Sequence, residues 1–111
     1  MHTHIDVTAF KKILDLDTQD PSLDFINVCT TSEYDGMHIH GVRSVPLDTL
    51  GEHLDEFKDK KAIYIHCMGG RRSVQAIEIL EGLGVSAELI NIDGGILAWI
   101  DAGFPIQPTL P

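Results

Sequence analysis

The residues best suited to chemistry in this sequence surround Cys67. The run Cys67-Met68-Gly69-Gly70-Arg71-Arg72-Ser73 brings together a thiol, two glycines and two adjacent arginines. Only a thiolate is a good nucleophile, and a free cysteine has a pKa of about 8.5, so this thiol needs help near neutral pH. Inward-facing backbone N–H groups of residues 68–73, glycines that allow close approach, and neighbouring guanidinium groups would all stabilise the anion. The run therefore predicts a reactive cysteine in an anion-binding loop.

Two simpler interpretations apply to parts of this loop. A buried structural cysteine followed by a glycine turn would explain Cys67 and one glycine, but not a Gly-Gly-Arg-Arg-Ser run that opens an amphipathic helix. Ser73 could cap that helix, or its hydroxyl could reach the sulfur, and both alternatives stay open.

The loop is positioned by a strand before it and a helix after it. Residues 61–66 form an apolar strand candidate, and residues 73–83 place Ala76, Ile79, Leu80 and Leu83 on one helical face. Elsewhere the pattern alternates in the same way. The pattern predicts extended segments at 23–29, 42–45 and 87–92. It also predicts helices at 7–16, from Thr30 to Gly36, after a cap at Asp48, and from Gly94 through Trp99.

Strands separated by crossover helices predict an α/β fold with a mostly parallel sheet covered by helices on both faces. Ligands bind beyond the carboxyl ends of the strands in such sheets. Cys67 follows a strand directly, so we expect it at that edge.

Composition narrows the class of protein. The 111 residues suit one domain over 1–111, and 43% hydrophobic content can form a core. A net charge of −9 disfavours nucleic acid and anionic membranes as partners, and there is no apolar run of about 18 residues. The N-terminus has neither the basic start nor the apolar run of a secretory signal, so we expect a cytoplasmic protein. Two cysteines do not make a disulfide framework.

Four stretches, in order, resemble single-domain rhodanese-like sulfurtransferases. The residues that carry this resemblance are 64–73, Asn27-Val28-Cys29 through Glu33-Tyr34, 37–42 with 45–47, and 93–99 with 103–105. The resemblance implies a doubly wound fold with a five-stranded sheet. It also implies that Cys67 accepts a sulfane sulfur from thiosulfate or a persulfide and passes it to a thiol, cyanide or a protein acceptor.

The same resemblance implies ping-pong kinetics, no metal and no organic cofactor. It assigns donor binding to Arg72 and leaves Arg71 for solvent or a partner. Related phosphatases place the arginine one position further on, so the loop 67–72 is the smaller, sulfurtransferase-type cradle. Nothing demands an oligomer, and we expect a monomer.

The sequence also departs from the family pattern. Asn27-Val28-Cys29 stands where the family usually has Asp-Val-Arg, and Met37 stands where a glycine usually precedes the histidine. Cys29 is then either a resolving thiol that attacks an oxidised or persulfidated Cys67, or a small wall residue beside it.

Further alternatives remain. The chain could be a non-catalytic binding or regulatory module of the same fold, or a redox protein that uses Cys29 and Cys67. The pairs His2/His4 and His38/His40 alternate like zinc ligands, but no matching cluster accompanies them, so no metal is expected. His66 precedes the nucleophile, and strand alternation points its side chain away from that of Cys67.

Overall fold

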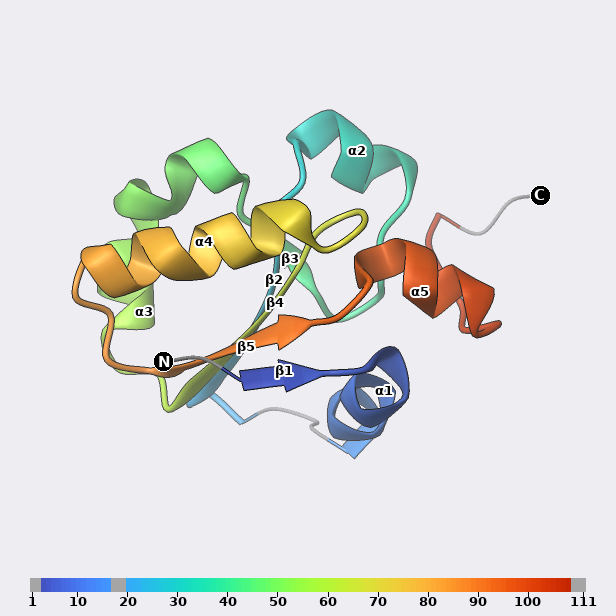
Figure 1. The fold of residues 1–111 in the computed structure, drawn as a ribbon, viewed down its shortest axis with the longest axis horizontal. Coiled ribbons are helices and arrows are strands. Elements are labelled where there is room, and N and C mark those ends of the chain that lie inside the picture. The colour runs from blue at the N-terminus through green and yellow to red at the C-terminus, as the bar shows by residue number, and fades with distance from the viewer. Residues whose placement is uncertain (1–2, 17–19, 109–111) are drawn as a thin grey trace.

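A parallel five-stranded sheet forms the centre of the molecule in the computed structural model, which describes residues 3–16 and 20–108 (Figure 1). The strands are β1 (Thr3–Ile5), β2 (Leu23–Asn27), β3 (Arg43–Ser44), β4 (Ala62–His66) and β5 (Glu88–Ile92). Their spatial order is β1-β5-β4-β2-β3, and all neighbouring pairs run parallel. The central strand β4 therefore ends in the middle of the sheet's carboxyl edge.

Helices cover both faces of this sheet, as predicted (Figure 1). One face packs against α1 (Val7–Leu16) and α5 (Gly95–Asp101). The other packs against the 3-10 helix η1 (Leu47–His53), α3 (Leu54–Phe57) and α4 (Arg71–Gly82). Helix α2 (Thr31–Gly36) follows the carboxyl end of β2. The parallel sheet covered on both faces, predicted from the alternating elements, and the doubly wound five-stranded fold implied by the family resemblance are both confirmed.

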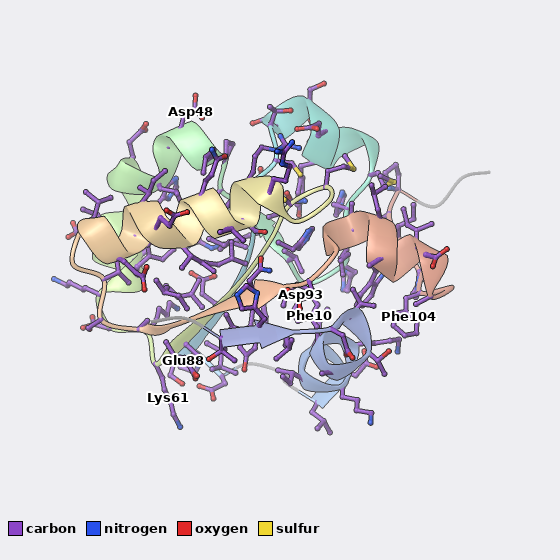
Figure 2. All side chains as sticks on the ribbon, in the orientation of Figure 1. Phe10, Asp48, Lys61, Glu88, Asp93 and Phe104 are labelled. Atoms are coloured by element: carbon purple, nitrogen blue, oxygen red, sulfur yellow. The ribbon has the colours of Figure 1, made fainter. Side chains whose placement is uncertain are left out.

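Alternation along β4 divides its side chains between the two cores. Ile63, Ile65 and Cys67 belong to the core under α4, whereas Tyr64 packs in the core under α1 and α5. Phe10 fills the second core, with its ring centroid 5.9 Å from that of Trp99 (Figure 2). Figure 2 also shows Lys61 and Glu88 at the amino end of the sheet, opposite the Cys67 loop.

Two local predictions need revision. The periodicity analysis did not identify β1, although the resemblance implies five strands, because a three-residue edge strand is too short to show a pattern. The prediction that Asp48 caps a helix is wrong. That segment begins at Leu47 as a 3-10 helix after Pro46, without a side-chain cap, and the Asp48 side chain points away from the sheet (Figure 2). Proline fixes its own φ and starts the turn one residue earlier.

Candidate active site

Cys67 lies immediately after β4, in the loop that Figure 1 shows between α2 and α5. The residue is only 1% exposed, and its sulfur lies at the amino end of α4. The Gly70 N–H donates to Sγ at 3.0 Å, and the Ser73 hydroxyl oxygen lies 3.6 Å from the same sulfur. The loop is therefore wrapped around the sulfur atom.

These contacts favour the thiolate. Burial alone would raise the pKa of Cys67, because a charged sulfur loses its hydration. The Ser73 hydroxyl and the backbone N–H groups of Ser73, Gly70 and Arg72 outweigh burial, and they leave the pKa of this thiol below its usual value. The structure places the donors that the glycines and the helix start led us to expect around the sulfur, and the binding of an anionic substrate by this loop stays a prediction.

The outer side of the loop is held by its carbonyl oxygens. The Ile96 N–H donates to the Cys67 carbonyl at 3.0 Å, and the Leu97 N–H donates to the Met68 carbonyl at 3.1 Å. Both peptide bonds that follow these carbonyls are trans, so the N–H groups of Met68 and Gly69 point the opposite way, away from α5. Neither N–H has an acceptor among the described residues, so both are available to an anion inside the loop.

Gly95 makes this contact with α5 possible. Its φ is +60°, and a Cβ there would lie 2.6 Å from the Met68 carbonyl oxygen and closer still to that of Cys67. Only a glycine lets α5 approach the loop this closely. Gly94-Gly95 was expected only as a helix start, and the glycine pair itself was the available signal for this second role.

Ser73 does not cap α4. That helix begins at Arg71, and its cap is Gly70, with φ +109° and no side-chain hydrogen bond. The capping alternative is therefore wrong, and the structure instead places the fully buried Ser73 hydroxyl beside the Cys67 sulfur.

The Arg72 side chain forms a bidentate ion pair with Glu33 of α2. The Nη1–Oε1 distance is 2.7 Å and the Nη2–Oε2 distance is 3.0 Å. Glu33 also accepts the Thr30 N–H at 2.9 Å in a capping box that opens α2. The hydrogen bonds from Arg72 and then from Thr30 lower the pKa of Glu33 to about 2. Sequence reasoning predicted Arg72 in the loop and did not predict its carboxylate partner.

Arg72 also separates two surface hollows. One is lined by Gly70, Arg71, Arg72, Val74 and Gln75, and the other by Val28, Thr30, Pro46, Leu47, Asp48 and Arg72. Arg71 is exposed at the rim of the first hollow. Met68 is partly buried and packs against both cores. The predicted loop residues are thus brought together, with Arg72 facing Glu33 of α2 and Arg71 exposed to solvent.

Cys29 lies on the same side as Arg72. It is 1% exposed, and its sulfur lies 3.8 Å from Arg72 Nη2. Its backbone N–H donates to the Asn27 side chain at 2.8 Å, so the asparagine holds this turn. Burial raises the pKa of Cys29 to about 11, which keeps this thiol neutral. Both cysteines are free thiols.

Of the histidines that the structure describes, His66 contacts the Cys67 loop. His38 stacks on Tyr34 at 4.1 Å, and its Nδ1 hydrogen-bonds to the Tyr34 carbonyl at 2.8 Å, as expected for a structural residue. Within residues 3–16 and 20–108, no three potential metal ligands come together, and His2 lies outside these ranges.

The fold and the loop define a class of α/β protein in which a strand-end cysteine sits in an amide-lined cradle. The family model described as "Rhodanese-like domain" matches residues 7–102, and the chain belongs to this family. In the part of the chain that the structure describes, no helix has the length and apolar character needed to span a membrane.

Individual known proteins are also similar to this chain in sequence or structure. The "Putative sulfur carrier protein YrkF" of Bacillus subtilis is 34% identical over 95 residues, or 86% of this chain and 49% of that protein. The "Sulfurtransferase" of Allochromatium vinosum is 30% identical over 90 residues, or 81% of each chain. A crystal structure of a rhodanese-like domain protein from Staphylococcus aureus matches with a TM-score of 0.74 and 31% identity, covering 87% of this chain and 90% of that one. The chain spans 49% to 59% of the length of the first curated relatives that it matches.

Proposed function

We propose that this chain is a sulfurtransferase that carries a sulfane sulfur as a persulfide on Cys67. The observation that supports this most is the orientation of the loop backbone. The Gly70 N–H donates to the thiol sulfur, while the N–H groups of Met68 and Gly69 point away from α5 and have no acceptor in the described chain. The Gly70 N–H stabilises the thiolate, and the N–H groups of Met68 and Gly69 are suited to bind a second, transferred sulfur inside the loop.

The reaction runs in two displacement steps. The Cys67 thiolate attacks the outer sulfur of thiosulfate, an S–S bond forms, and the S–S bond of the donor breaks with sulfite leaving on the electron pair. A thiolate acceptor or cyanide then attacks the outer sulfur of the persulfide. Cys67 leaves as the thiolate, stabilised by the same amides that first activated it, so no cofactor or external oxidant is needed.

The surrounding residues have supporting roles in this proposal. Arg72 binds the anionic donor from the wall it shares with Glu33, and Arg71 stands at the rim, where a protein donor or acceptor could approach. The Cys67 thiol donates to the Ser73 hydroxyl oxygen in the structure, and when Cys67 is a thiolate this hydroxyl would donate to the sulfur instead. Cys29 serves as a small neutral wall residue. Because both cysteines are free thiols, a reducing compartment such as the cytoplasm fits them best. We propose a monomer that works as one domain over residues 1–111.

Mass spectrometry of the intact protein tests this proposal. Incubation with thiosulfate should add one sulfur, roughly 32 Da, and cyanide or dithiothreitol should remove it. The variant Cys67→Ser should show no gain, whereas Cys29→Ala is the matched control and should load normally. A wild-type protein that stays unmodified with thiosulfate and with a small-molecule persulfide would refute the transferase and favour a binding module.

The redox alternative makes a different prediction. A resolving Cys29 would form a disulfide with Cys67 after mild peroxide treatment, with a loss of about 2 Da that Cys29→Ala abolishes. The neutral, buried Cys29 thiol beside Arg72 supports the wall role instead.

A further inference from the structure

We propose that His66 is a positioning residue that sets the reactivity of Cys67 through the backbone of the loop. This inference rests on the proposed function, since it concerns how the same sulfur is activated. The observation that supports it is a hydrogen bond from the fully buried imidazole of His66 to the carbonyl oxygen of Cys67.

His66 is the last residue of β4, and its side chain points away from the sulfur. The residue is 1% exposed, and Nδ1 lies 2.9 Å from the Cys67 carbonyl oxygen. A carbonyl oxygen can only accept, so Nδ1 carries the hydrogen in this contact. Nε2 is then a lone-pair acceptor, and it has no partner among the described residues. The opposite tautomer would bury an unpaired N–H and set two lone pairs against each other, so the geometry assigns the Nδ1–H form.

Burial keeps this imidazole neutral. Desolvation lowers the pKa of His66 to about 4, although the Cys67 carbonyl acts in the opposite direction. His66 therefore stays a single-proton donor at neutral pH, and it does not compete with the sulfur for a proton.

The hydrogen bond fixes the orientation of one peptide group. The Cys67 carbonyl accepts from His66 on one side and from the Ile96 N–H at 3.0 Å on the other. With that oxygen held toward α5, the Met68 N–H of the same peptide faces the loop interior. Without the His66 donor, the carbonyl would keep the Ile96 N–H but would be held less firmly. Any rotation of the peptide that brings this oxygen toward the thiolate would disfavour the charged sulfur through their repulsion.

Two polar substitutions at His66 distinguish its hydrogen bond to the Cys67 carbonyl from a contribution to core packing. The side-chain nitrogen of His66→Asn takes the place of Nδ1, whereas that of His66→Gln takes the place of Nε2. Tyr64→Leu is the packing control, because Tyr64 lies on the same strand and packs in the core on the α5 side, against the rings of Phe10 and Phe25.

The measurement is the rate of iodoacetamide alkylation at Cys67 as a function of pH, followed by mass spectrometry of the Cys67 peptide. We expect His66→Asn to react within about twofold of wild type and His66→Gln about fivefold more slowly below the thiol pKa, the factor that corresponds to one hydrogen bond. Tyr64→Leu should react at the wild-type rate.

Equal rates for the Asn and Gln variants would overturn the inference, and so would an equal slowing of Tyr64→Leu. Alkylation requires no sulfur transfer, so this result stands apart from the mass-gain test. A protein that fails to load sulfur can still show the Asn–Gln difference, and a protein that loads sulfur can lack it.

Discussion

Replacing Gly95 by alanine tests whether the approach of α5 sets the geometry of the cysteine loop. The new Cβ would lie 2.6 Å from the Met68 carbonyl oxygen and nearer still to that of Cys67. Both neighbours are backbone atoms, so neither can rotate away as a side chain would. Either the loop or the start of α5 must shift, and the hydrogen bonds from Ile96 and Leu97 to these carbonyls lengthen.

The size of the effect follows from two contributions. An alanine at a positive φ costs about 1–2 kcal/mol, and forcing an extra carbon into a packed site typically costs about 1–3 kcal/mol more. Gly103 provides a matched control, because its φ is +82° and an added Cβ there meets nothing within 4 Å. We therefore expect Gly95→Ala to lower the free energy of unfolding by about 3 kcal/mol and Gly103→Ala by about 1 kcal/mol.

Urea unfolding measures both variants against wild type, and the thiosulfate mass gain measures their loading. Gly95→Ala should load sulfur more slowly even where it is fully folded, whereas Gly103→Ala should load normally. If the two alanine variants lose the same stability and load at the same rate, the contact between α5 and the loop does not control the site.

Three further predictions concern charge and hydrogen bonding. First, His66 has a pKa of about 4 in the folded protein against an ordinary value of 6.5. Between these two pH values only the unfolded chain binds the proton at His66. The free energy of unfolding of wild type should therefore fall by on the order of 3 kcal/mol as pH falls from 6.5 to 4. Urea titrations of His66→Asn should lack this loss. Second, Glu33→Gln leaves the Arg72 charge uncompensated and should lower the KM for thiosulfate about threefold. Arg72→Ala should raise this KM. A higher KM in Glu33→Gln would contradict a donor-binding role for Arg72. Third, Ser73→Ala removes a hydroxyl 3.6 Å from the sulfur and should slow Cys67 alkylation about threefold below its pKa, while unchanged alkylation would remove the hydroxyl from the site.

Local patterns were sufficient to predict most of the fold. The strand before Cys67 and the helix after it are strongly patterned, and the structure has them at Ala62–His66 and Arg71–Gly82. The short edge strand β1 has one partner and three residues, so its pairing with β5 depends on contacts far along the chain. The start of the segment at Leu47 depends on Pro46, whose fixed φ counted for more than the capping preference of Asp48.

Like the fold, the candidate active site has parts that the sequence predicts and parts that it does not. The wrapping of residues 67–73 around the sulfur was predictable, because the sulfur and its amide donors are close in sequence, whereas the capping alternative for Ser73 was wrong. The partners from other elements were not, since Glu33 lies 39 positions from Arg72 and the sequence alone does not say which carboxylate reaches it. The place of Gly95 against the Cys67 carbonyl likewise depends on how α5 packs.

In the Cys67 loop, the carbonyl and the N–H of the same peptide group have different roles. In one peptide, the carbonyl bonds to α5 and His66, and the attached N–H faces the sulfur side. The Arg71 side chain is exposed to solvent, whereas residues outside the loop, such as Gly95 and His66, contact the loop carbonyl groups. Substitution of the exposed Arg71 by another residue that preserves the loop dihedral angles should therefore affect the sulfur less than substitution of Gly95 or His66. Because α5 donates to two loop carbonyls, we expect the reactivity of the thiol to depend on the packing of α5 as well as on the loop sequence.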